Sequence, residues 1–415
     1  MKILWICNIL FPEAEGLISG ETSLRSSGGW MLGASAALAQ VEGVTLYVAA
    51  VSDKVSQLTK VKGKSIIYYI IPYGRGNMKT NPEYMPYWKR ISEEIQPDIV
   101  HLHGTEYSHG HAYLKACGTD NVVISIQGLL HACSKYYTAG ISTFDILRFG
   151  SLADLRRGGI LRGKHRFCRS SVYELETLSM ARYFLGRTSW DKARTWAVNS
   201  EAEYFHCDEV LRPEFYDGQI WSEDACDSYS IFLSSAAYPI KGFHRVLEAM
   251  PMVLKEFPLA KIKVAGKNII SSGKMKISGY GRYIKMLLSK YGLEDKVTFL
   301  GALDATQMKN EYLRSNVFVC PSSIENSPNS LGEAQILGVP SIAAYVGGVK
   351  DMMRGAEDAM YRFEETEMLA EIICNVFRNP DFYDREALRQ VALHRHDPKE
   401  NTSALLSCYN AILNK

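Results

Sequence analysis

The sequence reads Val317-Phe-Val-Cys-Pro-Ser-Ser-Ile-Glu-Asn-Ser-Pro-Asn-Ser-Leu-Gly-Glu-Ala-Gln-Ile-Leu-Gly-Val-Pro340 at its most informative point. The apolar run at residues 317–320 predicts a buried strand, and the polar loop after it leads into a helical pattern that ends at Gly338. Glu325 is then expected on the loop and Glu333 on the first turn of the helix. Such a strand-loop-helix unit is typical of a parallel α/β sheet.

The start of this predicted helix is suited to an anion. Orphan backbone N–H groups and the positive end of the helix dipole meet there, and together they favour a phosphate group. Glu325 and Glu333 flank the same point, and carboxylates accept hydrogen bonds from hydroxyl groups. The loop therefore offers what a nucleotide-activated sugar requires, which is amides for its diphosphate and carboxylates for its hydroxyls.

Glu325 and Glu333, separated by seven residues, resemble the E-x7-E motif of retaining glycosyltransferases of the GT-B type, family four. The resemblance implies that Glu325 acts in catalysis by accepting hydrogen bonds from the donor hexose, and that Glu333 holds the ribose of the nucleotide. It also implies that the amides of Asn329, Ser330 and Leu331 bind the diphosphate. The alternative is that Glu333 is an ordinary acidic residue near a helix N-terminus.

Composition limits the classes of protein to which the chain can belong. Its 415 residues are too many for one hydrophobic core and predict two domains. A net charge of +2 argues against nucleic acid as a partner. Nine cysteines without a C-x-x-C pair predict reduced thiols and a cytoplasmic protein. The apolar start reads as a first strand, and no apolar run is long enough to cross a bilayer.

Apolar strand-like runs alternate with helical patterns along the chain, which predicts an α/β fold with parallel sheets. The resemblance implies GT-B, with two Rossmann-like, doubly wound domains facing each other across a cleft. We expect an N-terminal acceptor-binding domain at residues 1–205, a linker at 206–229 and a C-terminal nucleotide-sugar donor-binding domain at 230–394. Residues 395–415 are expected to form a helix, capped by Asp397, that crosses back to the N-terminal domain. An end helix packing on its own domain is the alternative.

The turn at Lys241-Gly242 resembles a Lys-Gly turn of the family, in which the ammonium pairs with a donor phosphate. A compact charge suits the neutralisation of a leaving diphosphate, so Lys241 is a candidate catalytic residue. Many relatives carry an arginine a few positions earlier, where this chain has Ser235. Lys267, which follows a predicted strand, is the candidate for a substitute cation in the donor site.

Three further donor-site candidates follow from the resemblance in the N-terminal half. Gly28 and Gly29 lie between the first strand and a helix, where the missing side chains let the backbone approach a diphosphate. Arg187 follows the last predicted strand of this half and is expected to face the cleft. An interdomain ion pair is the alternative for Arg187.

A strand end in the N-terminal half carries two candidate site residues. The segment Asp98-Ile-Val-His-Leu-His-Gly-Thr-Glu106 resembles a family segment that brings His103 and Glu106 to the carboxyl edge of the sheet, and His103 is a candidate catalytic residue. His101 is expected to be structural instead. Gln127 stands where many relatives carry a histidine near the transferred sugar, and it is expected to contact the donor.

Residues 148–169 hold seven lysines or arginines against the single Asp154, with apolar residues interleaved. On the acceptor half, such a stretch predicts peripheral contact with an anionic membrane. The alternatives are a solvated helix face and a contact with an acceptor phosphate. The expected location is the cytoplasm, with the inner face of the membrane as the site of this contact.

The predicted activity is retaining transfer of a hexose-type sugar from a UDP or GDP sugar to a glycan or lipid-linked acceptor. No Asp-x-Asp motif stands at a strand end, so we expect a metal-independent reaction without a cofactor, in which amides and Lys241 neutralise charge. Surface polysaccharide or lipopolysaccharide assembly is the expected setting. The alternatives are a sugar-nucleotide epimerase or phosphorylase of the same fold, and a non-catalytic nucleotide-sugar binding module.

Overall fold

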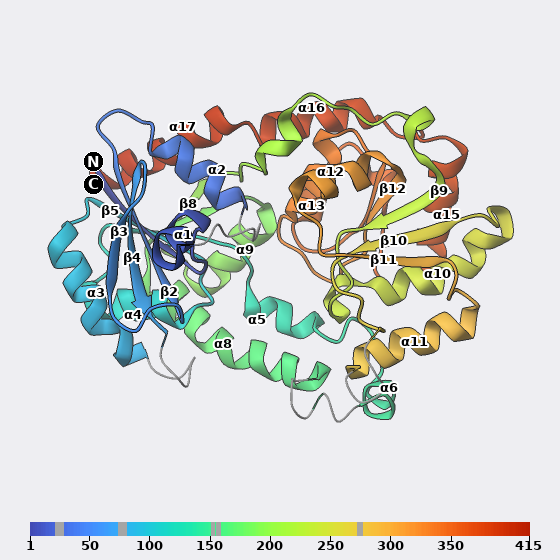
Figure 1. Ribbon diagram of the computed structural model, residues 1–415, viewed down its shortest axis with the longest axis horizontal. Helices are drawn as coiled ribbons and strands as arrows, with labels where there is room; N and C mark the ends of the chain where they lie inside the picture. Colours follow the sequence, from blue (N-terminus) through green and yellow to red (C-terminus); the bar gives the residue numbers. More distant parts are fainter. Residues whose placement is uncertain (21–28, 74–80, 151–153, 155–158, 272–276) are drawn as a thin grey trace. The chain divides into compact units, whose positions relative to one another are not determined.

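The computed structural model describes residues 1–20, 29–73, 81–150, 154, 159–271 and 277–415. Contacts between residues divide the chain into two compact units (Figure 1). The N-terminal unit comprises Met1–His131, Cys168–Leu211 and Arg395–Lys415, and the C-terminal unit comprises Ala132–Phe167 and Arg212–His394.

An eight-stranded sheet forms the centre of the N-terminal unit. Its strands are β1 (Lys2–Cys7), β2 (Thr45–Ser52), β3 (Thr59–Lys62), β4 (Ile66–Pro72), β5 (Ile99–His103), β6 (Val122–Ser125), β7 (Tyr183–Gly186) and β8 (Glu203–His206). They are ordered β3-β4-β2-β1-β5-β6-β7-β8, and only β3 pairs antiparallel. Strands covered on both faces read as continuous apolar runs, and all five residues of β5 are buried, its two histidines included.

Helices pack around this sheet. They are α1 (Pro12–Ser19), α2 (Gly29–Leu38), α3 (Asn81–Ile95), α4 (Ser108–Cys117), α9 (Ser189–Val198) and α17 (Pro398–Leu413), with α5 (Leu130–Cys133) and α8 (Ile160–Met180) shared between the units. The side chain of Asp397 accepts from the amides of Lys399 and Glu400 and so caps α17. Figure 1 shows α17 beside α2, and Leu405 and Tyr409 of α17 belong to the core of the N-terminal unit.

The C-terminal unit contains a six-stranded parallel sheet. Its strands are β9 (Asp227–Leu233), β10 (Lys261–Ala265), β11 (Val297–Gly301), β12 (Ser315–Cys320), β13 (Ser341–Ala344) and β14 (Met360–Tyr361), in the order β11-β10-β9-β12-β13-β14. The chain moves outward from β9 in one direction and then from β12 in the other. Ligands of doubly wound sheets bind at the carboxyl ends of strands where the order reverses in this way.

The helices of the C-terminal unit include two short 3-10 segments that are important for the site, η2 (Pro213–Tyr216) and η4 (Pro239–Lys241). The α-helices are α6 (Thr143–Arg148), α10 (Phe243–Glu256), α11 (Gly279–Tyr291), α12 (Ala305–Leu313), α13 (Asn329–Ile336), α14 (Val349–Met352), α15 (Thr366–Arg378) and α16 (Arg385–Arg395). The apolar faces of α10, α11 and α15 fill the core against the sheet.

The predicted α/β class with two doubly wound sheets is confirmed. The sequence patterns did not predict β3, β8 and β14, which are short strands at or near sheet edges. Residues 132–167, expected in the N-terminal domain, instead belong to the C-terminal unit. The physical reason is burial, because Ala139, Ile141 and Ile160 join the core of that unit and the ring of His244 bonds the carbonyl of Ala139 at 2.9 Å.

Candidate functional site

The loop after β12 holds Glu325 against two donors. The ammonium of Lys241 lies 2.6 Å from Oε1 of Glu325, and the hydroxyl of Ser322 donates to the same oxygen at 2.8 Å. The side chain of Glu325 keeps 16% of its surface exposed. The structure thus brings together the two candidate catalytic residues of the C-terminal half, on segments that follow β9 and β12.

Close backbone packing positions Lys241. The next residue, Gly242, has φ of +69°, and a Cβ added to it would lie 1.7 Å from the carbonyl oxygen of Pro321. Only glycine permits this approach. Burial acts to lower the pKa of Lys241, but the carboxylate of Glu325 outweighs burial and the pKa is raised. Lys241 therefore stays cationic at neutral pH.

A second glycine packs against the backbone of Glu325. A Cβ on Gly347, whose φ is +53°, would lie 1.9 Å from the carbonyl oxygen of Glu325. The amide of Gly348 donates to that carbonyl at 3.1 Å. The loop backbone is therefore packed against glycines at Pro321 and at Glu325, while Lys241 and Ser322 hold the carboxylate of Glu325.

Helix α13 begins at Asn329 and offers fewer free amides than the sequence predicted. The amide of Leu331 donates to the carbonyl of Pro328 at 2.9 Å, so its contact with a diphosphate stays a prediction. For Asn329 and Ser330, no backbone acceptor is found among the described residues. Glu333 is the fifth residue of the helix, one turn further in than expected.

Glu333 forms a bidentate ion pair that the sequence analysis did not predict. Nε of Arg212 lies 2.7 Å from Oε1 of Glu333, and its Nη2 lies 2.8 Å from Oε2. Glu333 is buried, and the guanidinium of Arg212 stacks 4.9 Å from the ring centre of Phe215. Burial acts to lower the pKa of Arg212, but the carboxylate of Glu333 outweighs burial and raises it. Arg212 lies in the segment interpreted as an aperiodic linker, so no pattern marked it.

The remaining donor-site candidates make few contacts. Lys267 is exposed, and among the described residues it forms no hydrogen bond or ion pair, so its role stays a prediction. The hydroxyl of Ser235 accepts from the amide of Ala237 at 3.3 Å. Gly29 is the first residue of α2, whereas Gly28 lies outside the described residues.

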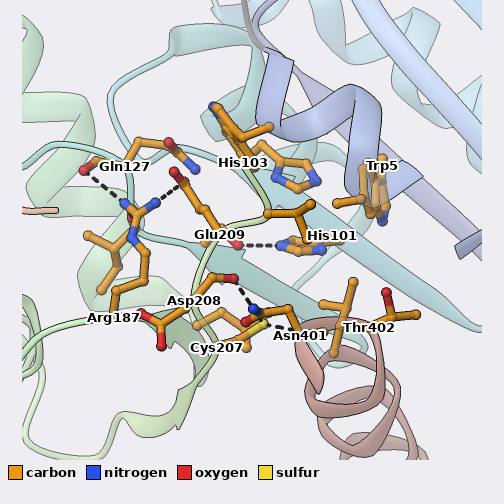
Figure 2. A pocket seen from close by; sticks show the side chains of 17 residues that line it. Trp5, His101, His103, Gln127, Arg187, Cys207, Asp208, Glu209, Asn401 and Thr402 are labelled. Atoms are coloured by element: carbon orange, nitrogen blue, oxygen red, sulfur yellow. Dashed lines mark hydrogen bonds and ion pairs between the residues drawn. The ribbon is translucent and has the colours of Figure 1, made fainter. Parts of the chain in front are cut away.

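The N-terminal unit contains a cavity of about 50 Å³ at the carboxyl end of its sheet, which has room for a few water molecules. Figure 2 shows His103, Gln127 and Arg187, all expected at the site, lining it together with Trp5 and Glu209. The ring of His103 stacks on His101 at 4.0 Å between ring centres. Neither ring nitrogen of His103 has a hydrogen-bond partner within the described part of the chain. Burial lowers the pKa of His103 to about 3, so the ring is neutral.

His101 has the structural role that its strand position predicted. Its Nδ1 lies 2.6 Å from the hydroxyl of Tyr409, and its Nε2 lies 2.6 Å from the hydroxyl of Ser125. The indole N–H of Trp5 also donates to the hydroxyl of Tyr409 at 3.0 Å. These bonds connect β1, β5 and α17 inside the N-terminal unit.

Arg187 is engaged within its own unit. Its guanidinium donates to the carbonyl of Ile126 at 2.6 Å and to that of Gln127 at 3.3 Å, and it pairs with the carboxylate of Glu209 (Figure 2). An interdomain ion pair is therefore not what Arg187 forms. Burial lowers the pKa of Arg187. The guanidinium thus holds the backbone that presents Gln127.

Beside the same sheet edge, two carboxyl groups differ in their surroundings. Glu174 is fully buried and accepts from the amides of Leu130 and His131 at 2.6 and 2.8 Å, and its Oε1 lies 2.6 Å from Nδ1 of His131. For Glu106, the described residues provide no donor to its buried Oε2. Burial, with Glu174 nearby, raises the pKa of Glu106 to about 7. The sequence analysis identified Glu106 as a residue at this end of the sheet, whereas no sequence pattern indicated Glu174.

Apolar side chains are exposed within the basic stretch 148–169 and just before it, in the C-terminal unit. Phe144 and Leu147 of α6 are 69% and 67% exposed, and Leu161 of α8 is 47% exposed. Arg148 and Arg162 are exposed next to them. No helix in the described ranges is both long and apolar enough to span a bilayer, and no cluster of three potential metal ligands occurs in those ranges.

Comparison with known proteins supports the resemblance on which the sequence predictions rest. Residues 221–393 match the family model of glycosyl transferases group 1. The phosphatidylinositol N-acetylglucosaminyltransferase gpi3 subunit of Schizosaccharomyces pombe is 26% identical over 40% of this chain and 33% of its own length. A GDP-mannose-dependent monoacylated α-(1-6)-phosphatidylinositol monomannoside mannosyltransferase of Corynebacterium glutamicum is 26% identical over 36% of this chain and 38% of its own length. The chain thus spans about a third of the length of these curated relatives.

Solved structures match the whole chain at low sequence identity. Sucrose-phosphate synthase of Thermosynechococcus elongatus has a TM-score of 0.73 at 17% identity, covering 100% of this chain and 99% of the other. HepE of Anabaena, in complex with UDP and glucose, has a TM-score of 0.64 at 13% identity, covering 98% of both chains. These matches confirm the GT-B fold. Residues 221–393, which include Lys241, Glu325 and Glu333, are the part of the chain that matches the group 1 glycosyl transferases.

Proposed function

We propose that the protein is a retaining, metal-independent glycosyltransferase that moves a hexose-type sugar from a UDP or GDP sugar to an acceptor hydroxyl. The observation that best supports this function is the contact of Lys241 with Glu325 beside the start of α13. Both residues lie within the region that matches the glycosyl transferase family. A cation, a hydroxyl acceptor and free helix amides are the groups that a nucleotide-diphosphate sugar needs.

Each group has a distinct task in the proposed reaction. Lys241 neutralises negative charge on the leaving diphosphate, and the amides of Asn329 and Ser330 bind its oxygens. Glu325 accepts hydrogen bonds from the sugar hydroxyls and fixes the orientation of the ring. The contact with Glu325 holds Lys241 in place before the donor arrives, so little reorganisation is needed at the moment of reaction.

The cavity of the N-terminal unit, with the neutral ring of His103 in its lining, suits the acceptor. A neutral imidazole offers one donor and one acceptor, which matches a hydroxyl group, and both nitrogens of His103 are unused among the described residues. Glu106, with its pKa near 7, can exchange a proton at neutral pH. We place the acceptor hydroxyl near these two side chains and the donor on the C-terminal unit.

The exposed surface of α6 and the start of α8 suits an anionic lipid surface. Phe144, Leu147 and Leu161 supply apolar area, while Arg148 and Arg162 supply positive charge. A lipid-linked acceptor is consistent with the names of the two curated relatives, both of which contain phosphatidylinositol.

Sedimentation with vesicles tests the contact with an anionic lipid surface. We expect binding to vesicles rich in phosphatidylserine, loss of binding in the double variant Phe144→Ser/Leu147→Ser, and no binding to neutral vesicles. Equal binding of both proteins would contradict it.

A donor-consumption assay tests the activity itself. Purified protein is incubated with UDP and GDP sugars, with and without phosphatidylinositol vesicles or alkyl hexosides, in buffer containing EDTA. Consumption that requires an acceptor, with retained anomeric configuration in the product, is the expected result. Product without acceptor would indicate an epimerase, and binding without consumption would indicate a binding module. Loss of turnover in EDTA would contradict the metal-independent mechanism.

A further inference from the structure

We propose that Arg212 is a ligand of the donor diphosphate, presented to it by Glu333. This inference rests on the proposed nucleotide-sugar site and assigns to it a residue from outside the motif. Arg212 and Glu333 both lie in the C-terminal unit, 121 positions apart in sequence.

The first argument is charge. Glu325 already compensates the ammonium of Lys241 at 2.6 Å, and Glu333 adds a second carboxylate one turn into α13. Without Arg212, the groups around the helix start would carry a net negative charge, and the exposed Glu214 would add to it. Such a site would repel a diphosphate. With Arg212 included, the two carboxylates and the two cations have no net charge. The helix amides and the helix dipole can then attract the anion.

The second argument is hydrogen-bonding capacity. A guanidinium has five N–H donors, and Glu333 takes two of them at 2.7 and 2.8 Å. Three N–H groups of Arg212 remain uncommitted within the described residues. The planar fork of arginine matches phosphate oxygens, which is why arginine often binds phosphate. The carboxylate of Glu333 keeps lone pairs for ribose hydroxyls even while it holds Arg212.

The third argument is position. The ring of Phe215 in η2 supports the guanidinium at 4.9 Å and contacts Tyr312 edge to face at 5.9 Å. The hydroxyl of Tyr312 donates at 2.9 Å to the carbonyl of Ser330, the second residue of α13. Arg212 is therefore fixed, through two aromatic rings, next to the helix turn that carries the free amides. Lys241 and Arg212 then hold the diphosphate from the two ends of the stretch between Glu325 and Glu333.

The ratio of nucleotide to nucleoside affinity tests the proposal. Calorimetry with UDP, GDP, uridine and guanosine is compared between wild type and Arg212→Gln. We expect affinity for the preferred diphosphate to fall roughly tenfold to hundredfold, as for the loss of a charge-assisted hydrogen bond, while affinity for its nucleoside changes little. Arg212→Lys should recover part of the loss, because a point charge remains.

Two further variants keep the test decisive. Arg212→Gln leaves Glu333 buried without a partner and can unfold the protein, so the double variant Arg212→Gln/Glu333→Gln is measured as well, and its ratio should stay low. Arg378→Gln, which removes a similar bidentate pair with Glu256, is the matched control and should leave the ratio unchanged. An unchanged ratio in the Arg212 variants would overturn this proposal alone. Failure of wild-type protein to bind UDP or GDP would overturn the proposed function with it.

Discussion

The two units have related folds but present opposite chemistry at the carboxyl ends of their strands. In the C-terminal unit, each of the two glutamates holds a cation, Lys241 for Glu325 and Arg212 for Glu333. In the N-terminal unit, the cavity is lined by the neutral ring of His103 and by aromatic residues, and its ion pair between Arg187 and Glu209 is buried.

This difference suits two different substrates. A charged diphosphate is bound by fixed charges and oriented amides, whereas a hydroxyl group can also be bound by a neutral partner that both donates and accepts. The same doubly wound sheet can therefore hold either substrate, because the residues at the strand ends decide the chemistry. The following changes are expected to disturb one unit while leaving the other intact.

The largest effect is expected from Glu325→Gln. Removing the negative charge breaks the contact with Lys241 and weakens the hold on the sugar hydroxyls, so kcat should fall roughly 100- to 1000-fold, as for other lost electrostatic contacts in active sites. Turnover and donor affinity are measured together. Glu248→Gln, which removes a similar ion pair with Arg245 at 2.9 Å, is the control, and equal activity of the two variants would contradict a role for Glu325.

A smaller effect, on the free energy of unfolding, is expected from Gly347→Ala. The positive φ of Gly347 and its close approach to the carbonyl of Glu325 both make an added side chain unfavourable. The free energy of unfolding should therefore fall by more than the cost of about 1 to 2 kcal/mol for a left-handed residue alone. Gly355→Ala is the matched control, because Gly355 has φ of +87° and no atom within 4 Å of the added Cβ. Urea denaturation measures both variants. Equal losses would show that the loop around Glu325 adapts freely.

The smallest effect concerns pH and the N-terminal unit. Burial lowers the pKa of His103 to about 3, below the ordinary value of an unfolded histidine. The neutral ring thus contributes stability that is fully present above that ordinary value, near pH 6.5, and is lost as pH falls toward 3. His103→Phe keeps an aromatic ring and should weaken the dependence of the unfolding free energy on pH by about 1.4 kcal/mol per unit in this range.

Denaturation of His103→Phe at pH 5 and pH 7 measures this change. His165→Phe, at an exposed position of α8, is the control and should leave the dependence as it is. If the unfolding free energies of the two variants depend on pH in the same way, burial does not lower the pKa of His103. Nucleotide affinity at pH 7 should be unaffected in either case, because His103 lies outside the C-terminal unit.

The comparison also explains which parts of the site could be predicted from the sequence. Glu325, Glu333 and the start of α13 are close together in the chain, so strand, loop and helix signals identified them as one unit. Lys241 was found through the glycine after it. Arg212 could not be found in this way, because it reaches Glu333 only through the tertiary fold and lies in a segment without periodicity.

The fold was predicted in its class but not in all of its connections. Alternation of strands and helices predicts doubly wound sheets, yet it does not reveal that residues 132–167 leave one unit for the other. That choice depends on burial of Ala139 and Ile141 in a distant core. Likewise, the sequence places Leu331 at the start of a helix, but only the structure shows that its amide already bonds Pro328.

The three-part composition of the N-terminal unit has a consequence for biosynthesis. The hydroxyl of Tyr409 accepts the indole N–H of Trp5 and bonds the ring of His101, so side chains of β1 and β5 find these partners only when α17, 404 and 308 positions later, has been made. The continuous stretch from Arg212 to His394 carries most of the other unit and emerges earlier. A released chain that ends at His394 should therefore contain a protease-resistant C-terminal unit joined to an immature N-terminal one.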